Sequence, residues 1–235
     1  MATKAALSAE LGAIALPEPD FGRDMSVREA LERRRTTREI SDRKLSLRLL
    51  SNLLWAACGT NREKGPFGVQ GITAGSASNA QEIRVYVALE KGLFLYDPRL
   101  RTLLPVAAGD HRKLAIGKGQ ASFGSEAPAR LIYVADVDRF AEAGFQEPGL
   151  RDPETQKAYY FVDAGLAAGN VYLAAAALGL GAWFHNCDKP GLSKLLGLGS
   201  GQRPLFGQTI GYRRRGNPGD IDPSSARRYS SKKDQ

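Results

Sequence analysis

Arginines gather in two segments that lie far apart in this sequence. Residues 28–48 hold eight basic and four acidic side chains, and residues 213–235 hold seven basic and three acidic ones. The remainder is neutral on balance, so these segments carry the formal net charge of +8. Guanidinium groups bind anionic oxygens through paired hydrogen bonds, and the two segments therefore predict one or two compact sites for an anion. Solvated helix faces and a charged tail are the alternative for either segment alone.

A nucleic-acid partner is not expected. Proteins that coat nucleic acid usually spread basic residues over one face and interleave aromatic side chains for stacking, whereas the arginines here are concentrated near the two ends of the fold.

Cysteine and histidine are too few for other common kinds of site. Cys58, Cys187, His111 and His185 have no spacing that builds a zinc cluster or a disulfide framework. His185 and Cys187 would share one side of a strand, but no oriented acid or nucleophile elbow accompanies them. No Gly-x-Gly-x-x-Gly fingerprint follows a strand, which argues against a Rossmann site. We therefore expect no metal and assign no catalytic acid or base.

The elements that must position the arginines alternate between helical and strand periods. Apolar residues at helical spacing predict helices over 26–34, 46–58, 154–178 and 192–196. Alternating or continuous apolar runs predict strands over 83–89, 93–96, 103–106, 130–135, 182–185 and 208–212. The pattern predicts one α+β domain over 26–215, with an irregular arm over 1–25 and a basic C-terminal tail over 216–235. The segments 59–75 and 138–153 are expected to be loops.

The longest predicted helix also favours a subunit contact. Gly165 and Gly169 lie one turn apart among alanines, so another backbone can approach closely. Asp163 and Asn170 are expected to satisfy buried backbone groups or subunit contacts. They also interrupt its apolar run, so no membrane span is expected. The N-terminus lacks the pattern of a signal peptide, which favours a cytoplasmic location.

Four segments in order resemble the FMN-dependent nitroreductase family. Residues 33–38 are similar to its Arg-Arg-Ser/Thr-x-Arg motif, and residues 74–81 to its Pro-Ser-Ala-x-Asn-x-Gln segment, with Gly75 in place of the proline. Residues 163–181 resemble its central helix and the Gly-Leu-Gly turn that ends it, and residues 208–214 its closing strand.

The resemblance implies a nitroreductase-like fold, with a central antiparallel sheet flanked by helices, and a homodimer in which each FMN contacts both subunits. It implies that NADH or NADPH delivers hydride to the flavin, and that a small-molecule acceptor such as a nitroaromatic or a quinone is then reduced in a ping-pong cycle. The cofactor-binding residues that it implies are Arg34, Arg35, Thr36, Arg38, Ser76, Ser78, Asn79, Gln81, Asn186, Cys187, Arg213 and Arg214.

The expected roles divide the flavin between these residues. Arg34 and Arg213 or Arg214 are expected at the phosphate, and Arg38 at the pyrimidine end of the ring, where negative charge gathers on reduction. Arg34 and Arg38 are four residues apart and are expected on one helix face. The side chain of Asn79 is expected at the pyrimidine edge.

Two further short segments, residues 54–57 and 96–98, resemble the family's branch of SagB-type, azoline-oxidising dehydrogenases. The segment expected beside flavin N5 falls on Asn186 and Cys187, whose backbone amides are the expected donors. Asn186 stands where shorter nitroreductases often carry glutamate. A flavin-dependent dehydrogenase or oxidase of the same fold, acting on a peptide azoline or another specialised substrate, is therefore the alternative. A non-enzymatic nucleic-acid-binding module is the third.

Overall fold

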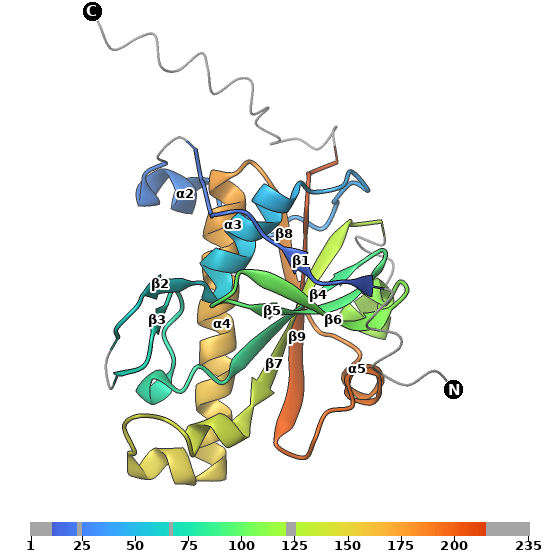
Figure 1. The fold of residues 1–235 in the computed structure, drawn as a ribbon. Coiled ribbons are helices and arrows are strands. Elements are labelled where there is room, and N and C mark those ends of the chain that lie inside the picture. The colour runs from blue at the N-terminus through green and yellow to red at the C-terminus, as the bar shows by residue number, and fades with distance from the viewer. Residues whose placement is uncertain (1–10, 23–24, 66–67, 121–125, 215–235) are drawn as a thin grey trace, which may run out of the picture.

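Seven strands form one antiparallel sheet through the middle of the molecule, in the order β1-β6-β5-β4-β7-β9-β8 (Figure 1). The computed structural model describes residues 11–22, 25–65, 68–120 and 126–214. The strands are β1 (Ile14–Ala15), β4 (Ile83–Leu89), β5 (Gly92–Asp97), β6 (Thr102–Ala108), β7 (Ala129–Asp136), β8 (Gly181–His185) and β9 (Gln202–Gly211). A separate hairpin joins β2 (Thr60–Arg62) to β3 (Gly71–Ile72). The predicted α+β fold with a central antiparallel sheet flanked by helices is confirmed.

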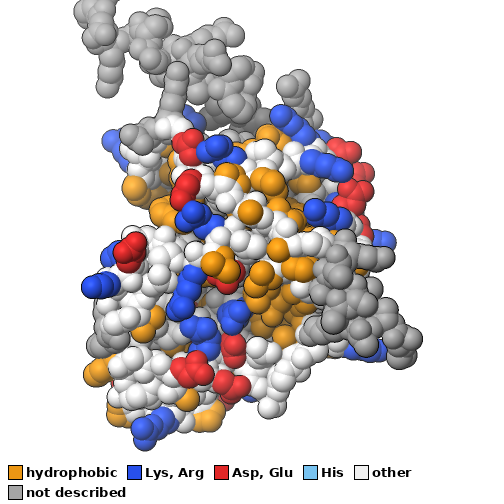
Figure 2. All heavy atoms as spheres, viewed as in Figure 1, with side chains coloured by type: hydrophobic (Ala, Val, Ile, Leu, Met, Phe, Trp, Pro, Cys, Tyr) orange, Lys and Arg blue, Asp and Glu red, His pale blue; other side chains and the backbone are white. Residues whose placement is uncertain are grey.

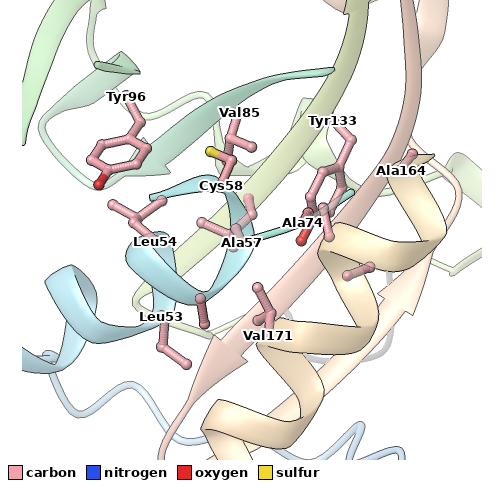
Figure 3. Close-up of a cluster of buried hydrophobic side chains, with 14 of the residues drawn as sticks. Leu53, Leu54, Ala57, Cys58, Ala74, Val85, Tyr96, Tyr133, Ala164 and Val171 are labelled. Carbon is pink, nitrogen blue, oxygen red and sulfur yellow. The ribbon is translucent and has the colours of Figure 1, made fainter. Parts of the chain in front are cut away.

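Helices cover both faces of the sheet. The two long helices, α3 (Leu47–Cys58) and α4 (Pro153–Ala177), pack on one face, where they enclose the larger core (Figure 3). The other face is covered by α5 (Lys189–Leu196) and the short helix η3 (Arg112–Ala115). The remaining helices are α2 (Val27–Arg33), η2 (Ala77–Asn79), η4 (Lys118–Gln120), η5 (Val137–Phe140) and η6 (Pro148–Arg151). Alternate residues of each strand therefore meet different helices.

Helix α4 has clear signals at both ends. The side chain of Asp152 accepts a hydrogen bond from the Thr155 N–H at 2.7 Å, and Pro153 occupies the first turn, where its missing N–H costs nothing. Gly179 follows the helix with a φ of 70°, a left-handed conformation that suits glycine. Most of its buried residues are alanines, which let α4 pack closely on α3 and the sheet.

Several predicted boundaries were wrong. The arm is not wholly irregular, because β1 pairs with β6. The segment 59–75 contains the β2–β3 hairpin, and η5 and η6 lie partly or wholly within 138–153. Strand β9 begins at Gln202, six residues earlier than predicted. A bulge between its pairs with Tyr133 and Val134 accommodates Pro204 within the strand. Residues 1–10 of the predicted arm and the tail 216–235 lie outside the described residues.

No helix in the described part of the chain is both long and apolar enough to cross a membrane. The same residues contain no group of three or more histidine, cysteine or acidic side chains that could hold a metal ion.

Candidate flavin-binding site

The first arginine motif lies against the C-terminal half of α4. Helix α2 ends at Arg33, and the Arg34 guanidinium lies 5.6 Å from the centre of the Tyr172 ring. The Thr36 hydroxyl is 3.2 Å from the hydroxyl of the same tyrosine, which also accepts the Phe184 N–H at 2.8 Å. Tyr172 therefore joins the motif, α4 and strand β8. Tyr172 was not among the predicted site residues, because an aromatic residue in an alanine-rich helix looks like an ordinary core residue.

The Arg38 side chain lies on the face of the sheet opposite to that of the Arg34 side chain. The Thr37 N–H donates to the Ala182 carbonyl at 2.9 Å, so the motif runs beside this edge strand. The Arg38 guanidinium lies 5.6 Å from the Trp183 ring. Because Ala182 belongs to the core under α4, Trp183 points to the opposite face of the sheet. The expectation that Arg34 and Arg38 share one helix face is therefore wrong: α2 ends before either residue, and each contacts a ring on a different face.

The closing strand brings a second basic segment to the same edge. The Arg214 N–H donates to the Glu39 carbonyl at 3.0 Å, and Ile40 pairs with Arg213. The Arg213 Nε donates to the Leu180 carbonyl at 3.3 Å, whereas the Arg214 guanidinium pairs with Glu126. The end of the first arginine motif and the end of the closing strand thus lie side by side, an arrangement that the charge distribution alone left open. Arg35 is exposed between Arg34 and Thr36.

The end of β8 is held by a buried, neutral histidine. The His185 Nε2 is 2.7 Å from the Thr209 hydroxyl, and its Nδ1 is 2.9 Å from the Asn186 carbonyl oxygen. Burial lowers the pKa of His185 to about 4, and burial raises the pKa of the Cys187 thiol to about 11. Both side chains are therefore uncharged at neutral pH, which argues against a Cys–His nucleophilic pair. The exposed Asn186 donates its N–H to the Gln120 side chain at 3.2 Å.

The segment from Ser76 to Gln81 is held in an unusual conformation. Ser78, Asn79 and Gln81 have φ values of 48°, 53° and 52°, in the left-handed region that non-glycine residues seldom adopt. The Ser76 hydroxyl accepts the Gln81 N–H at 2.9 Å, and the Gln81 Nε2 donates to the Asn79 Oδ1 at 3.0 Å. The Asn79 Nδ2 is buried and has no hydrogen-bond partner. A buried N–H donor without an acceptor lowers the stability of the folded protein. The Asn79 amide is therefore suited to donate a hydrogen bond to a ligand that presents an acceptor, such as a flavin carbonyl.

A pair of buried carboxyl groups supports this segment. The Asp163 carboxylate accepts the Ala77 N–H at 3.0 Å, and Asn170 donates to the Thr73 carbonyl at 3.1 Å, so both satisfy buried backbone as expected. Glu82 is fully buried, and no N–H or O–H group of the described residues donates a hydrogen bond to either of its side-chain oxygens. Burial first, and the adjacent Asp163 second, raise the pKa of Glu82 to about 8. Glu82 was not predicted, because a buried glutamate cannot be told from an exposed one in a single sequence.

The two groups of candidate residues contact α4 at different heights. Thr36 meets α4 at Tyr172, and Ala77 meets it at Asp163, nine residues earlier. At 1.5 Å per residue the two contacts are about 13.5 Å apart along the helix axis. We call the first group the arginine half-site, which comprises Arg34, Arg35, Thr36, Arg38, Arg213 and Arg214. We call the second the amide half-site, which comprises Ser76, Ser78, Asn79 and Gln81.

The site thus combines an antiparallel sheet between helical layers with a guanidinium-rich edge and a buried amide, both beside one long helix. A family model described as the nitroreductase family matches residues 31–212. A nitroreductase-like protein of Methanocaldococcus jannaschii is 30% identical over 168 residues, which cover 69% of this chain and 79% of that protein. The chain belongs to the nitroreductase family.

Solved structures agree with this assignment. The crystal structure of a nitroreductase-like protein from Ralstonia eutropha is 34% identical and has a TM-score of 0.73, covering 87% of this chain and 90% of that one. An NADPH:FMN oxidoreductase from Vibrio harveyi, complexed with NAD⁺, has the same fold at 20% identity and a TM-score of 0.56, covering 84% of this chain and 72% of that one.

Proposed function

We propose that this protein is an FMN-dependent oxidoreductase that takes hydride from NADH or NADPH and passes it to a small-molecule acceptor in a ping-pong cycle. One observation carries the proposal: the nitroreductase-like motifs meet α4 as two half-sites, one rich in guanidinium groups and one with a buried amide that has no partner. When bound, the flavin supplies the atom that accepts and returns hydride. The chain binds and orients it.

Each half-site fits one part of FMN. Arg34, Arg35, Thr36, Arg213 and Arg214 would hold the phosphate, and Arg38 would stabilise negative charge at the pyrimidine end of the ring. The positions of Arg34 and Arg38 on opposite faces of β8 support these separate roles. Ser76, Ser78 and Gln81 would hold Asn79 so that its Nδ2 donates to a flavin carbonyl. The backbone N–H groups of Asn186 and Cys187 would face flavin N5, with the Asn186 N–H exchanging Gln120 for the cofactor.

The test is release of the bound cofactor and determination of its mass, followed by stopped-flow reduction with NADH and with NADPH. Purified protein that carries FMN and bleaches with either donor supports the proposal. A colourless protein that does not bind added FMN contradicts it and favours a non-enzymatic role.

The alternative is a flavin-dependent dehydrogenase or oxidase of the same fold, acting on a specialised substrate such as a peptide azoline that gives its hydride to the flavin. The exposed and uncharged Asn186 favours it, because the position beside flavin N5 then lacks the glutamate of shorter nitroreductases. Turnover with quinones or nitroaromatics, compared with that on azoline peptides, separates the two.

The phosphate arginines give a direct prediction. We expect Arg34→Ala and Arg213→Ala each to weaken FMN binding about tenfold to a hundredfold, because each removes a charge-assisted hydrogen bond worth roughly 1.5–3 kcal/mol. Arg214→Ala should cost less, because its guanidinium already pairs with Glu126. Fluorescence titration of the apoprotein with FMN measures all three. Arg28→Ala, on the exposed side of α2, is the control. Unchanged affinity in all three variants would assign these arginines to solvent or subunit contacts.

The separation of the half-sites supports an obligate homodimer in which one subunit supplies the arginine half-site and the other the amide half-site. The exposed face of α4 supports the same arrangement, because Val162 and Leu166 are 59% and 48% exposed beside Gly165. Apolar side chains at this density on one helix face favour burial against a second copy.

This arrangement predicts the behaviour of a glycine variant. A Cβ at Gly165 meets nothing within 4 Å in one subunit, so Gly165→Glu should leave the subunit folded while it places a charge in the interface. Light scattering should give twice 25.4 kDa for the parent protein and 25.4 kDa for the variant, with weaker FMN binding. Gly199→Glu, at an exposed glycine that is also open, should stay dimeric. A parent protein that is monomeric and still binds FMN would refute the dimer.

A further inference from the structure

A second basic site lies behind the amide half-site. A pocket of about 280 Å³ opens beside the first residues of β4 and the end of β5, and Gln81 forms part of its wall. Cys58, Val85 and Tyr96 also line it, and Figure 3 shows these three side chains close together where α3 meets the sheet. None of the motif arginines at positions 34–38 lines this pocket.

Three arginines from three different elements line the same pocket. Arg84 comes from β4, Arg99 from the turn between β5 and β6, and Arg139 from η5. The face of the molecule in Figure 2 carries a group of basic side chains near its centre, with acidic ones beside it. Burial first, then Arg84 and to a smaller extent Arg99, lower the pKa of Arg139, whereas Asp136 and Glu142 raise it. Both arginines and both carboxylates therefore lie near the Arg139 guanidinium.

The acidic groups nearby only partly neutralise this charge. Asp136 lies 3.8 Å from the Arg84 guanidinium, a loose ion pair. Asp97 lines the pocket, but one of its oxygens accepts the N–H groups of Arg99 and Leu100 at 2.9 and 3.0 Å and is fixed in that turn. The lining therefore carries three positive charges against one negative charge.

We propose that this pocket binds the phosphate group of a small phosphorylated molecule, at a site separate from the flavin phosphate. A phosphate monoester carries a charge of about −1.5 to −2 near pH 7 and offers three acceptor oxygens, which matches the excess charge and the three guanidinium groups. The volume is just below the usual range for small-molecule sites, so the phosphate and little else of the ligand would be enclosed.

The pocket is also joined to the amide half-site. The Arg139 Nε donates to the Ala80 carbonyl at 3.1 Å, and Gln81 holds the Asn79 side chain from the opposite side of the pocket wall. A ligand that draws Arg139 or Gln81 toward itself would therefore bear on the backbone beside Asn79.

Calorimetric titration of the FMN-loaded protein with inorganic pyrophosphate at constant ionic strength tests the site, because the cofactor's own phosphate then fills the arginine half-site. We expect one molecule bound per chain, and binding at least tenfold weaker in Arg139→Gln and in Arg99→Gln. Arg99 is exposed and has no ion pair within the described residues, so its variant should fold even if Arg139→Gln does not. Arg28→Gln removes one positive charge from α2, at a residue that does not line the pocket, and this variant should bind pyrophosphate with the affinity of the parent protein.

Two further titrations separate the sources of the phosphate. Excess FMN should not displace pyrophosphate, and both should bind one chain at once, since the flavin phosphate belongs to the arginine half-site. Displacement by NADPH but not by FMN would identify the nucleotide donor as the ligand and support the proposal. Absence of binding, an equal loss in Arg28→Gln, or displacement by FMN would overturn it. The titration needs no turnover, so its failure is distinguishable from failure of the proposed activity.

Discussion

Replacing Glu82 with glutamine should make the protein more stable at pH 9 and change little at pH 4. The buried carboxyl has no donor for either of its oxygens, so it needs its own proton to donate a hydrogen bond to Asp163. A glutamine amide supplies such a donor at every pH. We expect a gain on the order of 3 kcal/mol at pH 9, measured by urea unfolding.

The sign of the pH dependence follows from the raised pKa. Below the ordinary value of 4.5 the carboxyl is protonated in both the folded and the unfolded chain, and its contribution is constant. Between 4.5 and about 8 the unfolded chain loses the proton while the folded chain keeps it, so stability should fall as pH rises through this window. Above about 8 the loss should level off.

The control for this experiment is Glu142→Gln, which makes the same change at an exposed position after η5. Its unfolding free energy should follow that of the parent protein across the window. If Glu82→Gln were less stable than the parent at every pH from 5 to 9, Glu82 would instead be an ionised partner of Arg139, a nearby cation that favours its charged form.

Gly207→Ala should lower the melting temperature by roughly 6–12 °C, corresponding to about 3 kcal/mol in a domain of this size. A Cβ at Gly207 would lie 2.0 Å from the Ala115 carbonyl oxygen and 2.8 Å from the His185 ring. The first of these atoms is backbone and cannot rotate away. Thermal unfolding followed by circular dichroism measures the change.

The same variant should also weaken cofactor binding, because Gly207 pairs with His185 at the end of β8, just before Asn186. Gly119→Ala is the matched control, since a Cβ there meets nothing within 4 Å. A Gly207→Ala protein with the melting temperature of the parent would mean that η3 moves aside freely, and that the close approach does not fix β8.

The larger elements were predictable because their signals are local. The helix over 154–178 was placed within one residue at each end, since Asp152 and Pro153 start it and Gly179 stops it. The antiparallel meander of β4, β5 and β6 was predicted because apolar and other residues alternate along this part of the chain. The β2–β3 hairpin could not be predicted in the same way, because strands of three and two residues are too short for any period.

The candidate site was predictable as a set of segments but not as a geometry. The order of the motifs indicated Arg34, Asn79 and Arg213, and Asp163 was expected to satisfy buried backbone groups. Tyr172 was missed, and the partners of both side chains could not be predicted. Tyr172 bonds to partners 136 and 12 residues away in the chain, and Asp163 to one 86 residues away. Such pairings depend on tertiary contacts, which a single sequence does not record.

The two contacts on α4 also limit which insertions and deletions this helix can tolerate. One residue added between Asp163 and Tyr172 would rotate the following part of the helix by about 100° and shift it by about 1.5 Å. Asp163 and Tyr172 could then no longer both reach their partners. Four added residues would restore the direction but lengthen the interval by about 6 Å. Family members that keep both contacts should therefore keep this interval free of insertions and deletions, whereas the stretch before Pro153, which is not part of either contact, can vary in length.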